Sequence, residues 1–99
     1  MKKILKRMEA LSAKEPKTLI QRFLKLGEEC GELAQEVGIV DKVSGFKYKK
    51  AGDDGISGEC VDVMICALSI FYGEGGTEKE LEEIFDKKMT KWESKMEIK

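Results

Sequence analysis

"LGEECGELAQE", residues 26–36, places acidic side chains in a segment that otherwise has the pattern of a buried helix. A second stretch, "GECVDVMICALSI" at residues 58–70, sets Glu59 and Asp62 at the head of an apolar run. Burying an unpaired carboxylate costs free energy, so acids in such places need a partner. A bound cation would satisfy both stretches at once. The acids of the first stretch are Glu28, Glu29, Glu32 and Glu36.

Apolar residues recur at helical spacing in four segments, which predicts four helices. Thr77 and Glu80 have the spacing of a capping box that opens the last of them. The expected fold is all-α, a four-helix bundle that self-associates, in one domain over residues 1–99. The segments cover about 4–11 (ending before Pro16), 17–37, 56–72 and 77 onward.

We expect the apolar stripe of each helix to be buried. The third segment is apolar on nearly every side, which is typical of a helix in the middle of an assembly. A chain of 99 residues builds only a small core, so association with further copies is expected. The stripes are Leu19, Phe23, Leu26, Cys30, Leu33 and Val37 in the second segment, and Leu81, Phe85, Met89 and Trp92 in the fourth.

Composition excludes several classes of function. The chain has no histidine, which removes Ser-His-Asp and Cys-His catalysis and histidine zinc sites. The formal charge is −1 and only Arg7 and Arg22 are arginines, so we expect neither a nucleic-acid polymer nor a membrane as partner. Three cysteines without a C-x-x-C pair fit a reduced, cytoplasmic protein. The start lacks a signal peptide's apolar stretch, and the run 60–73 is short for a membrane span and contains Asp62.

The acids form two like-charged pairs on helix faces. Residues three apart lie on one face, so Glu29 pairs with Glu32, and Glu59 pairs with Asp62. If the second and third helices pack with these edges facing, four carboxylates converge. Oxygen donors without nitrogen or thiolate suit a hard cation, Mg²⁺, with Mn²⁺ as a substitute.

A solvated acidic face is the alternative interpretation. Acids occupy exposed helix positions freely, and this alternative is the stronger one for residues 28–36 taken alone. It is weaker for Asp62, because residues 61, 63, 64 and 65 are all apolar. The two pairs together favour a metal site.

The acidic motifs resemble a known family. "EECGE", separated by 26 intervening residues from "ECVD", is similar to the E-E-x-x-E and E-x-x-D signature of MazG-type all-α nucleoside triphosphate pyrophosphohydrolases. "ELAQE" and the late "KKMTKWESK" extend the resemblance over about 17–95. It implies Mg²⁺-dependent hydrolysis of a nucleoside triphosphate to the monophosphate and pyrophosphate, in a dimer or tetramer whose pockets a neighbouring subunit completes.

The resemblance also implies roles for particular residues. Glu29, Glu32, Glu59 and Asp62 would bind Mg²⁺. Glu28, with Glu29, would be catalytic, either supporting a metal ligand or orienting or deprotonating the attacking water. Lysines would contact the phosphates, although each is also well explained as a solvated side chain. The candidates are Lys47, Lys49 and Lys50 in the long loop and Lys88, Lys91 and Lys95 in the fourth helix.

Aromatic side chains are candidates for stacking on the base. Phe46 and Tyr48 lie in the long loop, whereas Trp92 continues an apolar stripe, so core packing is the favoured interpretation for it. Two further functions stay open. One is a phosphoribosyl-ATP pyrophosphohydrolase, which has related helices and acidic motifs. The other is a non-catalytic helical assembly module whose acids bind a structural ion or a basic partner. Nucleotide-pool house-cleaning is the expected role of the enzyme.

Overall fold

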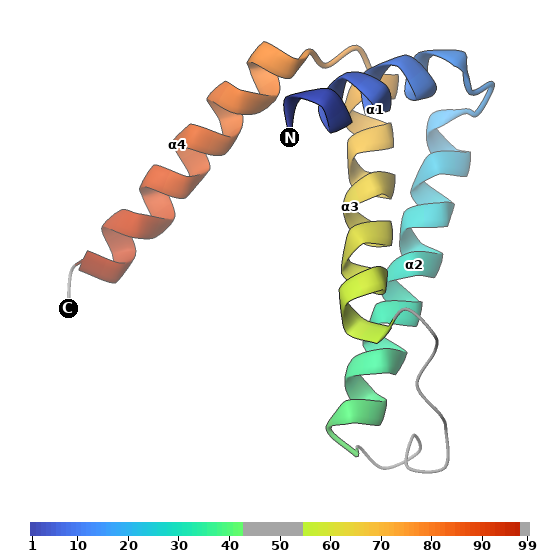
Figure 1. The fold of residues 1–99 in the computed structure, drawn as a ribbon, viewed down its shortest axis with the longest axis vertical. Coiled ribbons are helices and arrows are strands. Elements are labelled where there is room, and N and C mark those ends of the chain that lie inside the picture. Colours follow the sequence, from blue (N-terminus) through green and yellow to red (C-terminus); the bar gives the residue numbers. More distant parts are fainter. Residues whose placement is uncertain (43–54, 98–99) are drawn as a thin grey trace.

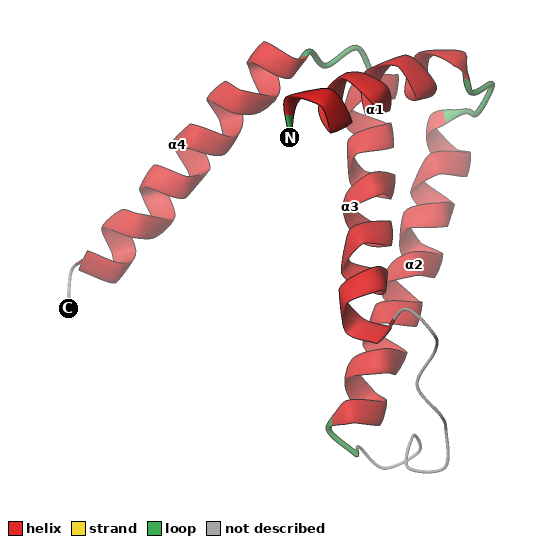
Figure 2. Cartoon of the chain, viewed as in Figure 1, coloured by secondary structure: helices red, strands yellow, loops and turns green. Residues whose placement is uncertain are grey.

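A computed structural model describes residues 1–42 and 55–97 of the chain. These residues form four helices and no strand: α1 Lys2–Lys14, α2 Leu19–Val40, α3 Gly55–Gly73 and α4 Glu78–Glu97 (Figure 1). Figure 2 shows the short loops that join α1 to α2 and α3 to α4. The all-α prediction is confirmed, and the helices lie where the apolar spacing predicts them.

Three of the helices pack together and the fourth projects. Helices α2 and α3 run antiparallel side by side, and α1 crosses their upper ends (Figure 1). Helix α4 packs against α1 near its beginning and then extends away from the α2–α3 pair. The described part of one chain therefore does not form the predicted four-helix bundle by itself.

Helix α2 begins at a capping box that the sequence analysis did not identify. The Gln21 backbone N–H donates to Thr18 Oγ1 at 3.2 Å, and the Thr18 N–H donates to Gln21 Oε1 at 2.9 Å. Both backbone donors would otherwise lack a partner within the helix. The motif fixes the first turn of the helix that carries the acidic stretch.

The turn between α3 and α4 is a Schellman motif. The N–H of Gly76 donates to the carbonyl of Phe71 at 2.9 Å, and that of Gly75 donates to Tyr72 at 3.1 Å. Gly75 has a φ of 96°, which favours glycine. A Cβ at Gly76 would overlap the ring of Phe71. The direction in which α4 leaves is thus set by backbone geometry.

The described residues have a small core where α1, α3 and α4 meet. Met8, Tyr72 and Leu81 are its buried members, and the rings of Phe71 and Tyr72 meet edge to face with centroids 5.4 Å apart. Leu5 and Leu68 pack around it. Burial of so few side chains agrees with the modest core expected of a short chain.

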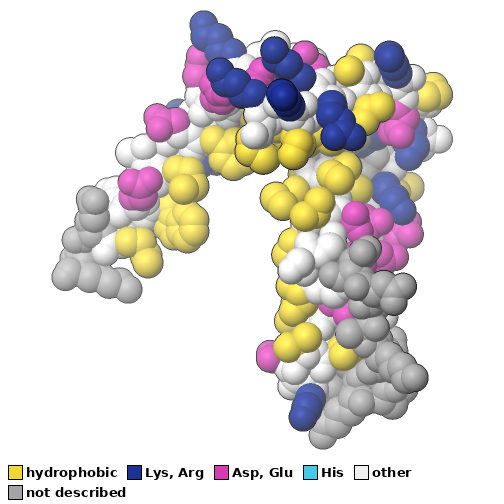
Figure 3. All heavy atoms as spheres, in the orientation of Figure 1, with side chains coloured by type: hydrophobic (Ala, Val, Ile, Leu, Met, Phe, Trp, Pro, Cys, Tyr) yellow, Lys and Arg dark blue, Asp and Glu magenta, His cyan; other side chains and the backbone are white. Residues whose placement is uncertain are grey.

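The expectation that the apolar stripes are buried is wrong for most of their residues in a single chain. On α4 only Leu81 is buried, while Phe85 is 58% and Trp92 61% exposed. No described helix covers these stripes, and Figure 3 shows hydrophobic side chains gathered along α4 and α3. The same holds on α2 for Leu19, Phe23, Cys30 and Val37, which are exposed.

Helix α3 is longer than the apolar run that the sequence analysis considered. Its 19 residues make it, within the described residues, the one helix long and apolar enough to cross a membrane, by length and composition alone. Core helices of soluble proteins pass the same test when they are mostly buried, whereas little of this helix is buried in one chain, and Glu59 and Asp62 lie within it.

Candidate metal centre

Helices α2 and α3 bring carboxylates together from distant parts of the chain. One oxygen from each of Glu29, Glu59 and Asp62 lies within 4.8 Å of the others. A second group, Glu28, Glu29 and Glu32, satisfies the same distance, and Glu29 belongs to both. The geometry follows from the three-residue spacing on each helix and from the contact between α2 and α3.

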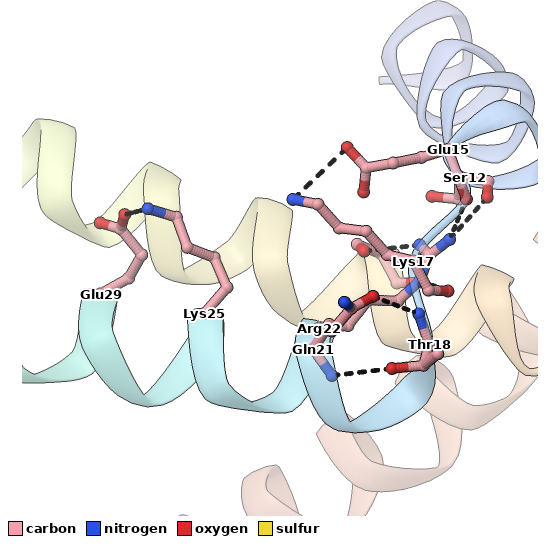
Figure 4. Close-up of polar contacts among 9 residues, drawn as sticks. Ser12, Glu15, Lys17, Thr18, Gln21, Arg22, Lys25 and Glu29 are labelled. Carbon is pink, nitrogen blue, oxygen red and sulfur yellow. Dashed lines mark hydrogen bonds and ion pairs between the residues drawn. The ribbon is translucent and has the colours of Figure 1, made fainter.

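Glu29 is the most buried member of the cluster, with 7% of its surface exposed. Lys25 Nζ lies 3.1 Å from its Oε1 (Figure 4). Its Oε2 is buried and has no hydrogen-bond partner in the described structure, and the same is true of Glu59 Oε2. A buried oxygen acceptor without a donor is costly and uncommon, so these two carboxylates favour either a proton shared between Glu29 and Glu59 or a bound cation.

The pKa values of the cluster report an excess of negative charge. Burial raises the pKa of Glu59 to about 7, and the charges of Glu32 and Asp62 add to the effect. The charge of Glu29 is the main cause that raises the pKa of Glu32. The hydrogen bond from Lys25 lowers the pKa of Glu29. Lys25 thus stabilises the charged form of Glu29, while Glu32 and Glu59 favour protons or a cation.

The donor set fits a hard divalent cation. Carboxylate oxygens are the ligands of Mg²⁺, and two of them here are buried without donors. Cys66 lies one helical turn beyond Asp62, but burial raises the pKa of its thiol, so it is not a ready thiolate ligand. The residues that would hold the ion are Glu29, Glu59 and Asp62, with Glu32 on the open side.

Glu28 and Glu32, the other predicted acids, lie at the exposed edge of the cluster. Glu28 Oε1 is 3.5 Å from Lys25 Nζ, so the two neighbouring glutamates share one lysine. An exposed carboxylate beside a cation site is accessible to water. This position suits the water-orienting or proton-accepting role that the resemblance implies for Glu28.

The predicted substrate-binding residues of α4 do not reach this site within one chain. Lys88 and Lys91 line a hollow of about 340 Å³ on α4 together with Ile84 and Lys87. Lys95 and Trp92 are exposed farther along the same helix, beyond its buried residue Leu81. The candidates in the long loop, Phe46, Lys47, Tyr48, Lys49 and Lys50, lie outside the described residues.

Arg22 is the residue near this site that sequence reasoning missed. It is 6% exposed, and its guanidinium joins α1, α2 and α3 (Figure 4). Its Nη1 donates to the carbonyl and hydroxyl oxygens of Ser69 at 2.9 and 2.7 Å. A signal was present in the sequence, because Arg22, Glu29 and Glu36 are spaced by seven residues and all are buried on one face of α2.

The other N–H donors of Arg22 bind backbone carbonyl oxygens at the end of α1 and in the loop that follows it. Its Nη2 donates to the carbonyls of Ser12 at 2.8 Å and Glu15 at 3.1 Å, and its Nε donates to that of Lys17 at 3.4 Å. Gly73 makes room for the guanidinium, because a Cβ there would lie 3.1 Å from Arg22 Cζ. Arg22 thereby holds α1, α2 and α3 in one arrangement.

Comparisons with known proteins give no relative for this chain. No family model, no curated protein and no solved structure matches it. Function is therefore inferred from the carboxylate cluster and from the acidic motifs that carry it.

Proposed function

We propose that this protein is a Mg²⁺-dependent nucleoside triphosphate pyrophosphohydrolase that converts a (d)NTP and water to a (d)NMP and pyrophosphate. The observation that carries the proposal is the meeting of Glu29, Glu59 and Asp62, with two buried oxygens that lack donors. The motif resemblance to MazG-type enzymes supplies the reaction class. Mn²⁺ would substitute for Mg²⁺, because both prefer oxygen ligands.

Bound Mg²⁺ offsets the charge of a triphosphate and makes a bound water more acidic. The protein's part is to hold the carboxylates and the substrate in a fixed geometry. Glu29, Glu59 and Asp62 are carried by packed helices, so their spacing does not depend on a loop. Glu28, exposed at the edge, accepts the proton of the water that adds across the anhydride bond between the α- and β-phosphates.

Self-association is part of the proposal, as a homodimer or homotetramer. It is supported by the exposed apolar side chains of α4, because a contiguous patch of this kind marks an interface. A second copy would bury Phe85, Met89 and Trp92 and complete a four-helix bundle. It would also bring the α4 lysines, Lys88, Lys91 and Lys95, toward the carboxylates of its neighbour.

The cellular setting proposed is the cytoplasm, with house-cleaning of the nucleotide pool as the role. Cys30, Cys60 and Cys66 are all free thiols, which fits a reducing compartment. The substrate is a free nucleotide, and we propose no nucleic-acid polymer and no membrane as partner, in keeping with the near-zero net charge.

The deciding experiment measures pyrophosphate release from each common NTP and dNTP, and from phosphoribosyl-ATP, with Mg²⁺ or with EDTA. Asp62→Asn should lower kcat/KM at least about 100-fold, because it removes a metal ligand. Asp86→Asn, at an exposed position of α4, is the matched control and should leave kcat/KM unchanged.

Three other results would redirect the assignment. Turnover of phosphoribosyl-ATP alone would favour that specialised enzyme. Binding of Mg²⁺ without turnover of any nucleotide would favour the non-catalytic assembly module. Full activity of the Asp62→Asn variant would remove the carboxylate cluster from the mechanism.

A further inference from the structure

A basic hollow lies directly beside the carboxylate cluster. It holds about 180 Å³ where the end of α1 and the α2–α3 seam meet. Three cationic side chains line it, Lys17, Arg22 and Lys25, whereas Glu15 is the one acid in its lining. Such a wall of charge favours an anion.

Arg22 gives the hollow a fixed positive charge. All five of its N–H donors are accounted for by backbone and hydroxyl oxygens, so the guanidinium is held in place. No carboxylate forms an ion pair with it in the described residues. A buried charge without a counter-ion is unfavourable, and an anion in the hollow would relieve this cost.

Lys17 is the cation that is free to meet a ligand. Its ammonium group lies 3.7 Å from a carboxylate oxygen of Glu15, and both side chains are nearly half exposed. An exposed ion pair of this length contributes little stability, so the lysine can exchange Glu15 for another anion. Lys25 already contacts Glu29 at 3.1 Å and Glu28 at 3.5 Å, so one of its three ammonium donors is left for an anion in the hollow.

The acidic and the cationic side chains lie one after the other along the line where α2 and α3 pack together. On α2, Glu29, Lys25 and Arg22 lie on successive turns, and on α3 the order is Asp62, Cys66 and Ser69. Lys25 lies between the two regions, since it lines the hollow and also binds Glu29. About 10 Å of helix separates Glu29 from Arg22. A ligand with several phosphates could therefore extend from the carboxylate cluster into the hollow.

We infer that this hollow is the subsite for the phosphates of the substrate that lie beyond the metal-held group, with Lys17 and Lys25 as binding residues of the same chain. The inference rests on the proposed function. It differs from the sequence-based expectation, which assigned phosphate binding to lysines of the loop and of α4. Arg22 contributes its positive charge to the hollow, and its hydrogen bonds hold the neighbouring backbone in place.

The test uses inorganic pyrophosphate as the probe, with its binding to the full chain measured by calorimetry in saturating Mg²⁺. Lys17→Met should weaken binding about tenfold, because it removes one charge-assisted contact. Glu15→Gln should tighten binding a few-fold, since it removes the acid that competes for Lys17. Lys14→Met, an exposed position on α1 outside the hollow, is the control and should bind pyrophosphate like the natural protein.

Failure of the subsite and failure of the enzyme give different results. Nucleotide turnover with a normal KM in Lys17→Met, and unchanged pyrophosphate affinity, would overturn the subsite and leave the hydrolase intact. Absence of pyrophosphate binding to the natural protein would also overturn it. Pyrophosphate binding that depends on Lys17, in a protein that hydrolyses no nucleotide, would support the anion subsite and refute the hydrolase.

Discussion

Arg22 on α2 donates hydrogen bonds to Ser69 on α3. Arg22 lies seven residues before Glu29, and Ser69 lies seven residues after Asp62. Glu29 and Asp62 meet across the same two helices. Because α2 and α3 are antiparallel, the step from Glu29 to Arg22 and the step from Asp62 to Ser69 run in the same direction. The Arg22–Ser69 contact thus lies about two helical turns from the meeting of Glu29 and Asp62. The Arg22–Ser69 contact therefore fixes the register in which the carboxylates converge.

Loss of Arg22 should destabilise the whole fold. Arg22→Met should lower the free energy of unfolding by about 2–4 kcal/mol, because the carbonyls of Ser12, Glu15 and Ser69 lose their donor. Urea titration followed by circular dichroism measures the change. Arg7→Met, at the exposed arginine of α1, should change it by less than about 0.5 kcal/mol. Equal effects in the two variants would contradict the role of Arg22.

Two glycine-to-alanine substitutions should have opposite signs. Gly73→Ala should destabilise by about 1 kcal/mol, because its Cβ would press on a guanidinium that five hydrogen bonds hold. Gly27→Ala, inside α2 with nothing within 4 Å of its Cβ, should stabilise by up to about 1 kcal/mol. Thermal unfolding of both variants measures the signs. Destabilisation by Gly27→Ala would instead reveal a close neighbour from another copy.

Binding of Mg²⁺ should strengthen as pH rises through about 7, the pKa of Glu59. The proton that Glu59 holds below that pH must leave before the carboxylate can bind a cation. Calorimetry in buffers of different ionisation enthalpy measures the released proton. The Glu59→Gln variant should lose this step near pH 7 and bind Mg²⁺ more weakly at every pH.

Without metal, the same group should make the fold less stable at higher pH. The folded-state pKa of Glu59 is raised to about 7 from an ordinary value of 4.5, so the folded state binds the extra proton between these values. The stability that Glu59 contributes is present at pH 4.5 and is lost as pH rises through 7. Unfolding midpoints measured in EDTA check this sign, and excess Mg²⁺ should reverse the loss at pH 8.

Exposed residues of α4 should control association. Phe85→Ser and Trp92→Ser should shift the protein toward monomer in sedimentation experiments, because each removes a large apolar side chain from the proposed interface. Glu83→Ser lies on the opposite side of α4 and serves as the control. A natural protein that stays monomeric at high concentration would refute the interface.

The sequence was sufficient to predict the helices, because they depend on local spacing, and the acids that share each helix face, three of which, Glu29, Glu59 and Asp62, meet across α2 and α3. Pro16 and the Thr77 cap marked helix ends, and the three-residue spacing put Glu59 and Asp62 on one face. The exposure of Phe85 and Trp92 in a single chain could not be predicted, since periodicity identifies the apolar face of a helix but not the molecule that covers it. Arg22 was missed because a buried polar stripe was not considered beside the apolar one.

The Arg22–Ser69 contact also limits how this chain can evolve. Inserting one residue between Arg22 and Glu29 would rotate the carboxylate by about 100° around α2 while the guanidinium stayed anchored. Homologous chains should therefore keep residues 23–28 at constant length, even where residue types other than Lys25 and Glu28 differ.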